Sequence, residues 1–189
     1  MTLVGCYPGS FDPPTVAHLA VAEAARDLAG LDRLDLVLSR RALGKEGAER
    51  SPLEARAAAL RAVAGRRPWL AVAVTEARLL ADVAAGYDVL VMGADKWAQV
   101  LDPAWYGGSE EARDEAVGRL PRVLVAPRAG WPAPPGVEVL DVHPAHLEVS
   151  STAAVAGRSE WLLGGPGAAG LGNGAPPGDP PVPRRAGHP

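Results

Sequence analysis

Residues 7–24 read YPGSFDPPTVAHLAVAEA, and this stretch decides the fold because it joins a strand to a helix through a short turn. The apolar run just before it, residues 3–7, has the composition of a buried strand and ends at a Pro-Gly-Ser turn over residues 8–10. Thr15 is a suitable N-cap for the alanine-rich helix that follows to about residue 29. The order strand, turn, helix predicts the first half of a βαβ unit.

Outside this stretch, apolar runs alternate with longer helical patterns along the chain. Further strands are expected over residues 34–38, 69–74, 89–92, 123–126 and 137–140. Helices are expected over residues 51–64, with Ser51 as the N-cap, over residues 76–85, after Ser109, and for a short stretch from Ser150. Such alternation is typical of an α/β fold with a mostly parallel sheet.

The length and the local composition predict one domain and a tail. A chain of 189 residues fits one domain, and we expect this domain over residues 1–163. From residue 164 onward glycine and proline dominate, and little apolar surface is available to offset the entropy of ordering. Residues 164–189 are therefore predicted to form a disordered Gly/Pro-rich tail.

The composition excludes several classes of protein. The formal net charge of −3 leaves no basic excess for binding a nucleic acid backbone, and no run of about 18 apolar residues is present to span a membrane. The one cysteine, Cys6, permits no intrachain disulfide and suits a reducing compartment. We expect a cytoplasmic protein whose partners are small molecules, and the sequence is compatible with a homo-oligomer.

Three loops follow candidate strands, and the ligands of an open parallel sheet bind beyond the carboxyl ends of its strands. In the loop at residues 9–18, a glycine turn exposes backbone N–H groups just before a helix N-terminus, and both features suit phosphate oxygens. His18, in the first helical turn, could donate a hydrogen bond to a phosphate. By residue type alone this is a weak signal, because most Gly-Ser turns are only turns and most lone histidines are structural.

The spacing within residues 7–24 resembles the first motif of the HxGH nucleotidyltransferases, which include nicotinate or nicotinamide mononucleotide adenylyltransferases and phosphopantetheine adenylyltransferase. Thr15 and His18 match the two ends of the motif, and Ala17 stands where glycine is usual. The resemblance implies a Rossmann-like fold, an open and mostly parallel sheet with helices on both faces. It also implies that His18 and the backbone of Gly9, Ser10 and Phe11 meet the triphosphate of ATP, with Mg²⁺ assisting.

The second loop is similar to the same family. Residues 89–95, VLVMGAD, resemble the strand and G-x-D stretch of the mononucleotide adenylyltransferases, which implies that Gly93 and Asp95 hold the nucleotide ribose. Trp105 follows at about the place where those enzymes stack a tryptophan on the pyridine ring of the substrate. From residue type alone, Trp97 and Trp105 could equally be core residues.

The third loop, residues 149–155 or VSSTAAV, resembles the closing S-S-T-x-x-R motif, which implies triphosphate contacts for Ser150, Ser151 and Thr152. Val155 stands where the family has arginine. Arg158 is the nearest cation and is assigned to this site on the condition that the helix continues to it; Gly157 is a residue that could end the helix first. Lys45, in the loop after the second strand, loosely matches a lysine that binds a substrate phosphate or ATP.

Taken together, the resemblance predicts an adenylyltransferase of NAD biosynthesis. It would transfer AMP from ATP to a phosphate-bearing small molecule, nicotinate or nicotinamide mononucleotide, and release pyrophosphate, with His18, Thr15 and Lys45 as its catalytic residues. Residues 74–88 lack the Ser-Tyr-Thr stretch that helps to hold the pyridine carboxylate in the nicotinate enzymes. Two alternatives stay open: a cytidylyltransferase acting on another phosphorylated acceptor, and a nucleotide-binding protein without catalysis.

Overall fold

The computed structural model describes residues 1–40, 50–132 and 134–163 of the 189-residue chain. Lys45 and the predicted tail, residues 164–189, lie outside the described residues, so the predictions on them stay predictions. Within the described ranges, no helix is both long enough and apolar enough to cross a membrane.

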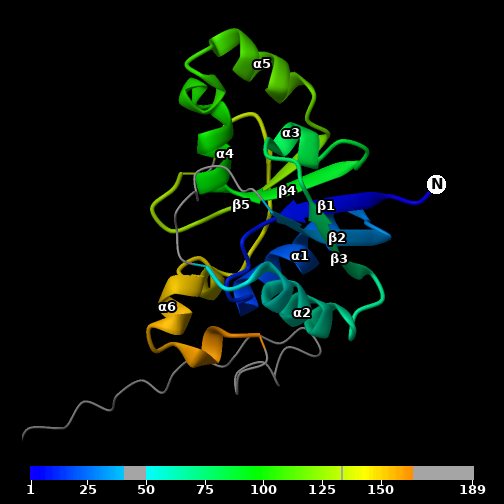
Figure 1. Cartoon of the computed structure of the whole chain (residues 1–189), viewed down its shortest axis with the longest axis vertical. Coiled ribbons are helices and arrows are strands. Elements are labelled where there is room, and N and C mark those ends of the chain that lie inside the picture. Colours follow the sequence, from blue (N-terminus) through cyan, green and yellow to red (C-terminus); the bar gives the residue numbers. More distant parts are fainter. Residues whose placement is uncertain (41–49, 133, 164–189) are drawn as a thin grey trace, which may run out of the picture.

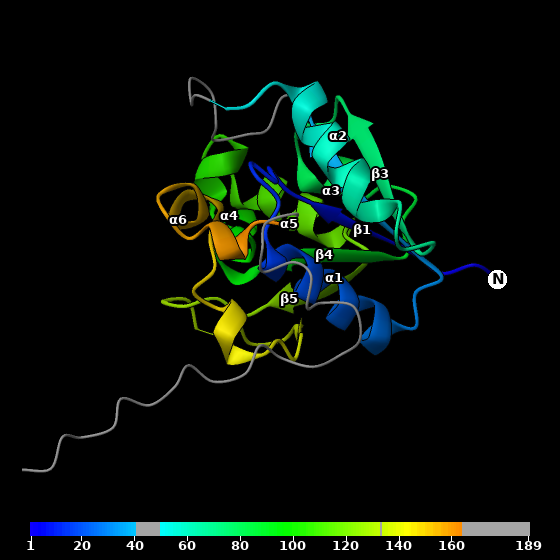
Figure 2. The same cartoon turned by 90° about the horizontal axis from the view of Figure 1, so that it is seen from below.

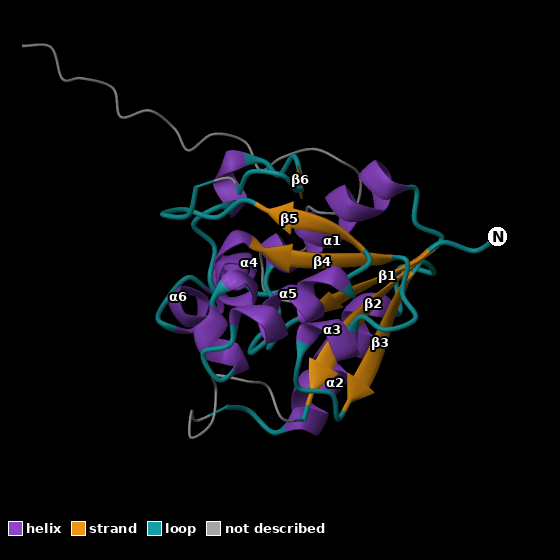
Figure 3. Cartoon of the chain, turned by 90° about the horizontal axis from the view of Figure 1, so that it is seen from above, coloured by secondary structure: helices purple, strands orange, loops and turns teal. Residues whose placement is uncertain are grey.

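The described residues form one six-stranded sheet in the order β3-β2-β1-β4-β5-β6, in which every pair of neighbouring strands is parallel (Figure 3). All six strands begin and end within one residue of the bounds that the apolar runs predict. They are β1 (Val4–Pro8), β2 (Arg33–Ser39), β3 (Leu70–Thr75), β4 (Val89–Gly93), β5 (Arg122–Ala126) and β6 (Glu138–Val139).

Helices cover both faces of this sheet, with α1 and α2 on one side and α3, α4 and α5 on the other (Figures 1 and 2). This arrangement confirms the predicted Rossmann-like α/β fold. The helices are α1 (Val16–Ala29), α2 (Leu53–Ala64), α3 (Leu80–Val83), α4 (Ala94–Leu101), α5 (Glu110–Gly118) and α6 (Ser151–Val155), and single 3₁₀ turns occur at Pro103–Tyr106, Pro144–His146 and Ser159–Trp161.

The core consists of two hydrophobic clusters, one on each face of the sheet, because alternate side chains of a strand point to opposite faces. Tyr7, Val91 and Leu124 pack with residues of α1 and α2. Cys6, with a fully buried side chain, packs with residues of α3 and α4. Both faces of the central strands are therefore buried, which explains their nearly continuous apolar sequence.

Two helix starts differ from the prediction. The helix expected over residues 76–85 is confined to Leu80–Val83, because side chains bind the backbone of Ala77: Thr75 Oγ1 accepts from its N–H at 3.1 Å and Ser39 Oγ donates to its carbonyl at 2.8 Å. The N-cap of α2 is Pro52 and not Ser51.

The strand order reverses between β1 and β4, and this is where an α/β sheet opens a crevice. β1 pairs with β2 from Val4 to Pro8, but its pairing with β4 covers only Gly5 and Cys6. The two strands therefore separate at their carboxyl ends. Side chains from the following loops can converge in the gap.

Candidate active site

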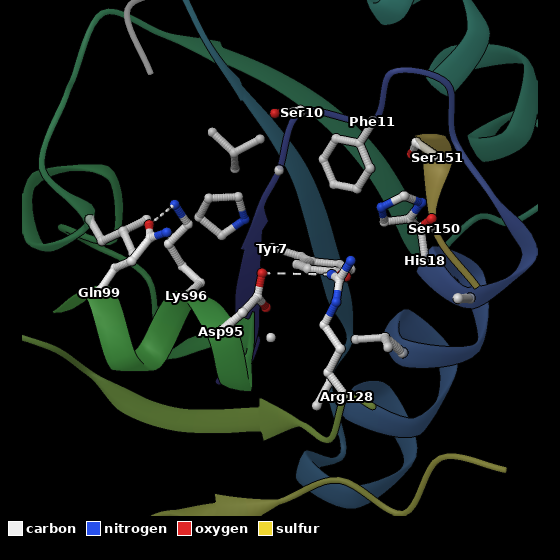
Figure 4. A pocket seen from close by; sticks show the side chains of 18 of the residues that line it. Tyr7, Ser10, Phe11, His18, Asp95, Lys96, Gln99, Arg128, Ser150 and Ser151 are labelled. Atoms are coloured by element: carbon white, nitrogen blue, oxygen red, sulfur yellow. Dashed lines mark hydrogen bonds and ion pairs between the residues drawn. The ribbon is translucent and has the colours of Figure 1, made fainter. Parts of the chain in front are cut away.

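A cavity of about 530 Å³ lies beyond the carboxyl ends of β1, β2, β4 and β5. Its walls include the loops that follow β1, β4 and β5, together with the start of α6 (Figure 4). The three sequence motifs therefore meet in one place. The predicted residues that line the cavity are Gly9, Ser10, Phe11, Thr15, His18, Gly93, Asp95, Trp105, Ser150, Ser151 and Thr152.

Phe11 anchors the loop after β1. Its side chain is 1% exposed and packs edge-on against the rings of Tyr7 and His18, at centroid distances of 5.5 and 4.9 Å. Its backbone has φ +46°, in the left-handed region that side chains other than glycine seldom adopt. Gly9 lies directly under the ring, because a Cβ placed on Gly9 would lie 2.7 Å from it. The loop is thus held by packing in a conformation that is unfavourable by itself.

The backbone N–H groups of this loop are of two kinds. The N–H of Gly9 donates to the carbonyl of Val37 at 3.1 Å, so it continues the sheet and is not available to a ligand. The N–H groups of Ser10 and Phe11 donate to no acceptor within the described part of the chain. Of the three amides predicted to meet a phosphate, only those of Ser10 and Phe11 are therefore available to bind one.

Arg56, which the sequence analysis missed, fixes the other side of the loop. It is 6% exposed, and it donates from Nη1 to the carbonyl of Ser10 at 2.9 Å and from Nε to the carbonyl of Ser51 at 3.1 Å. The N–H of Ser51 donates to Asp12 Oδ2 at 2.9 Å. Ser51 therefore uses its backbone to join α2 to the loop. The sequence gives no signal for this role of Arg56, because most arginines in helices lie at the protein surface.

The hydrogen bonds of His18 define its tautomer. The backbone N–H of Thr15 donates to Nδ1 at 2.9 Å, and Thr15 Oγ1 lies 2.9 Å from the same nitrogen. Because Nδ1 accepts, the proton of the neutral ring is on Nε2. Burial, aided by the charge of Arg128, lowers the pKa of His18 from 6.5 to about 4. At neutral pH the residue is an uncharged donor in the wall of the cavity.

Gly93 ends β4 and is the N-cap of α4, and Asp95 lies in the first turn of that helix. A Cβ on Gly93 would lie 2.5 Å from Asp95 Oδ1, so the absence of a side chain lets the carboxylate fold back over the strand end. Asp95 Oδ2 lies 3.7 Å from Nη1 of Arg128, and the two side chains are 34% and 45% exposed. The carboxylate thus reaches the cavity with a cation beside it.

Arg128 is a second residue that the sequence analysis missed. It stands two positions after the end of β5 and lines the cavity, and its guanidinium points toward Tyr7 and His18 (Figure 4). The rule applied to the other strands, that ligands bind beyond carboxyl ends, would have singled it out.

The structure separates the two tryptophans between which the sequence analysis could not decide. Trp97 is 8% exposed and belongs to the core on the α3 and α4 face of the sheet. Trp105 is partly exposed and lines the cavity. Its neighbour Tyr106 donates from its hydroxyl to the carbonyl of Val100 at 3.0 Å, which ties this 3₁₀ turn to α4.

The hydroxyls of the third motif have structural partners as well as a place in the cavity. Ser150 caps α6, with Oγ accepting from the N–H of Ala153 at 3.2 Å. Ser151 Oγ donates to the carbonyl of Pro13 at 2.7 Å and so joins α6 to the loop after β1. Thr152 is exposed on the cavity wall.

Arg158 does not lie where the sequence analysis placed it. The helix ends at Val155, and the backbone of Gly157 has φ +133°, so the condition of a continuing helix is not met. The guanidinium of Arg158 stacks 4.6 Å from the ring centroid of Trp161 and lies 3.8 Å from Glu160. Arg158 is not among the described residues that line the cavity, and Val155 is 70% exposed.

Comparison with known proteins agrees with this arrangement. The model of the cytidylyltransferase-like family matches residues 6–156. Two curated relatives are called probable nicotinate-nucleotide adenylyltransferase: that of Salinibacter ruber is 61% identical over 31 residues, 16% of each chain, and that of Bordetella pertussis is 49% identical over 37 residues, 20% of this chain and 19% of the relative. The chain thus matches less than one fifth of the length of these relatives.

Solved structures of similar fold extend over more of the chain. Nicotinic acid mononucleotide adenylyltransferase of Plasmodium falciparum, complexed with NaAD, has a TM-score of 0.58 and 13% identity over 82% of both chains. The same enzyme complexed with APC has a TM-score of 0.59 and 14% identity, again over 82% of both chains. At 13–14% identity, the similarity to these structures shows a shared fold and nothing more. The family match, which spans most of the described residues and all three motifs up to Val155, shows that the chain belongs to the cytidylyltransferase-like family.

Proposed function

We propose that this chain is an adenylyltransferase that transfers AMP from ATP to nicotinate or nicotinamide mononucleotide and releases pyrophosphate. One observation carries the proposal. The N–H groups of Ser10 and Phe11, which have no acceptor among the described residues, share one cavity with His18, whose Nε2–H is left free by the bond at Nδ1. Such a set of fixed donors suits the oxygens of a phosphate group.

The proposed reaction is an in-line displacement. An oxygen of the acceptor phosphate forms a bond to the α-phosphorus of ATP, the bond from that phosphorus to the bridging oxygen breaks, and pyrophosphate leaves with the electron pair. The attacking phosphate is already ionised near neutral pH, because its second pKa is about 6, so no protein base is needed. His18 and the two amides stabilise charge that develops on the phosphoryl oxygens, and Thr15 holds the imidazole in the donating tautomer.

The two ends of the cavity suit the two substrates. Asp95, in the cavity wall, would accept hydrogen bonds from ribose hydroxyls. Ser150 and Ser151 lie beside His18 (Figure 4), Thr152 lines the same cavity, and the three would border the triphosphate. Trp105 offers a flat apolar face for a pyridine ring. The names of the curated relatives and of the structures similar in fold support a pyridine mononucleotide as the acceptor.

Mg²⁺ belongs to this proposal as the companion of the triphosphate. In the described ranges, no group of three or more His, Cys, Asp or Glu side chains is arranged to hold a metal ion. Mg²⁺ binds with nucleotides mainly through phosphate oxygens and water, and it needs one or two carboxylates from the protein. Among the described residues, Asp95 and Asp12 are the carboxylates in the cavity wall, and the ion would neutralise phosphate charge beside them.

The remaining predictions are retained on the sequence alone. Lys45 is proposed to bind a substrate phosphate or ATP. A cytoplasmic location and small-molecule partners belong to the same proposal.

The test is to incubate the full chain with Mg²⁺, each nucleoside triphosphate and a panel of acceptors, and to measure pyrophosphate. The panel should contain nicotinate mononucleotide, nicotinamide mononucleotide, glycerol 3-phosphate and choline phosphate. We expect the fastest release with ATP and a pyridine mononucleotide. Release only with CTP and an alcohol phosphate would establish the cytidylyltransferase alternative, and nucleotide binding without any release would establish a non-catalytic binding protein.

A further inference from the structure

We propose that Lys96 and Gln99 of α4 form a subsite that recognises the substituent of the acceptor ring, and that this subsite takes a carboxylate in preference to a carboxamide. The inference rests on the proposed function, because it concerns the acceptor of the same reaction. The two pyridine mononucleotides differ only in this substituent. The subsite would therefore make nicotinate mononucleotide a better substrate than nicotinamide mononucleotide.

The pair lies at the end of the cavity away from the groups proposed to bind phosphate. Both side chains line the cavity. Figure 4 shows Lys96 and Gln99 on one side of it and His18, Ser150 and Ser151 on the other. A mononucleotide whose phosphate lies next to His18 would therefore extend its ring toward α4.

Trp105, proposed to stack on that ring, belongs to the same end of the cavity. The 3₁₀ turn that carries it follows α4 closely, and Tyr106 of this turn donates from its hydroxyl to the carbonyl of Val100 in α4 at 3.0 Å. All three residues line the cavity together with Lys96 and Gln99. A flat apolar face and a polar pair are thus neighbours, as a ring with one polar substituent requires.

The helical spacing of α4 brings the two polar side chains together. Ala94, Trp97 and Val100 of this helix are buried in the core. Lys96 and Gln99 are three positions apart, so they lie on one face of the helix. Nζ of Lys96 donates to Oε1 of Gln99 at 2.6 Å. The two side chains therefore form one polar group in the wall of the cavity.

This hydrogen bond makes the pair a set of donors. An ammonium has no acceptor, so the amide of Gln99 must turn its oxygen toward Lys96. The amide nitrogen, which has no hydrogen-bond partner within the described part of the chain, then faces away with its two N–H groups. A carboxylate can accept from both side chains with its two oxygens. A carboxamide has one oxygen, and its own NH₂ group would meet another donor, which lowers its affinity.

The charges around the pair favour the same choice. Asp95, the residue before Lys96, lies 3.7 Å from Arg128, and Figure 4 shows this ion pair on the side of Asp95 away from Lys96. Its negative charge is thus offset by another cation. A carboxylate beside Lys96 gains an attraction that an uncharged carboxamide does not. Because both side chains are accessible to solvent, added salt should weaken this preference.

The test compares kcat/KM for nicotinate mononucleotide and nicotinamide mononucleotide in the full chain and in two variants. We expect the wild type to prefer the acid at least about tenfold, the scale for a hydrogen bond to a charged group. Lys96→Met should lower kcat/KM for the acid about tenfold, mainly through KM, and change that for the amide little. Gln99→Glu should reverse the preference, because the new carboxylate repels the acid and accepts from the NH₂ group of the amide.

Arg119→Gln is the control for the loss of one positive charge. Arg119 is 51% exposed, pairs with Asp82 at 3.1 Å and is not among the described residues that line the cavity. This variant should keep the preference and all KM values within about twofold. In every variant the KM for ATP should also stay within about twofold, whereas damage to the fold would raise it.

A binding measurement separates this inference from the proposed function. Calorimetry of the two mononucleotides, in the presence of an ATP analogue with a methylene group between the α- and β-phosphorus atoms, needs no turnover. A preference for the acid that is lost in Lys96→Met supports the subsite even if ATP yields no pyrophosphate, in which case the proposed reaction alone fails. Equal affinity of the wild type for both mononucleotides, binding of neither, or a preference that survives both Lys96→Met and Gln99→Glu would overturn the assignment.

Discussion

The loop after β1 and the segment around α6 both bring a helix start to the same cavity, but different contacts hold them. The loop is fixed from both sides, by the buried ring of Phe11 and by the buried guanidinium of Arg56. The α6 segment is a helix of five residues that is joined to the loop by Ser151 and followed by exposed Val155. The first region leaves its chemical groups no freedom, and the second depends on its neighbours.

This difference indicates which residues of a motif can be substituted without disturbing the structure around them. In the loop, the ring of Phe11 packs against both Gly9 and His18, so a change at any of the three disturbs this packing. In the α6 segment, a guanidinium at position 155 would have no structural partner to lose. An exposed position such as 155 can therefore change without disturbing its neighbours, whereas a position in the packed loop cannot.

The largest effect is expected from His18→Ala, which removes a chemical group from the packed loop. The variant removes the Nε2–H donor and also leaves the N–H of Thr15 without its acceptor. We expect turnover to fall at least about 100-fold, while the free energy of unfolding drops by only about 1 kcal/mol. Pyrophosphate release and a urea unfolding curve measure both. Unchanged turnover in the folded variant would remove His18 from the chemistry and leave the loop a structural element.

The second prediction tests the packing of the loop with Gly9→Ala. The new methyl group would lie 2.7 Å from the ring of Phe11, so the ring and the loop must shift. We expect about 1–3 kcal/mol of lost stability from overpacking, and turnover lower by about tenfold or more, because small displacements at a site are costly.

Two controls accompany Gly9→Ala. Gly118→Ala should be harmless, since a Cβ there meets nothing within 4 Å. Adding Phe11→Leu to Gly9→Ala should recover part of the stability by making room for the methyl group. If Gly9→Ala behaves like Gly118→Ala, the loop is not held in the way that the structure shows.

The third prediction concerns Trp105, on the side of the cavity that neither region forms. Trp105→Ala should raise the KM for the pyridine mononucleotide several-fold and change that for ATP little, because stacking is worth about 0.5–1.5 kcal/mol beyond area burial. Trp131→Ala is the control, since this tryptophan is 45% exposed and outside the cavity. Equal losses for both substrates would place Trp105 in the scaffold.

The last prediction concerns the pH dependence of stability. The pKa of His18 is about 4 in the folded chain and near 6.5 when unfolded, so the unfolded chain binds more protons between these values. The contribution is fully present above pH 6.5 and is lost as the pH falls toward 4. Urea unfolding at pH 7 and pH 5 should show a smaller decrease for His18→Gln than for the wild type. An NMR titration of His18 with a midpoint near 6.5 would contradict the buried donor.

The sequence correctly predicted those strands and helices whose positions depend on neighbouring residues in the chain. Strands β1, β2, β4 and β5 could be predicted because most of their residues are buried on both faces, and α1 because the turn and Thr15 define its start. The helix at residues 76–85 was overestimated because side chains of β2 and β3 capture the backbone of Ala77. Helical spacing carries no information about such partners.

The site could be predicted where its groups follow a motif and not where they depend on contacts between distant segments. Arg56 lies 46 positions after the loop carbonyl that it binds. Arg128 faces Asp95 because β5 pairs with β4 in the sheet, which the strand order decides. The placement of Arg158 failed because Gly157 adopts a left-handed backbone, and the sequence does contain that signal.

The burial of Cys6 has a practical consequence. This thiol is the one cysteine of the sequence, its side chain is fully buried, and burial raises its pKa to about 12, so it presents almost no reactive thiolate at neutral pH. A maleimide dye added to the native chain should find no target. A cysteine introduced at Leu101, which is 40% exposed at the end of α4 and four positions before Trp105, would then take up the only fluorophore. A fluorophore at this position would then report whether the end of α4 moves when nucleotide binds.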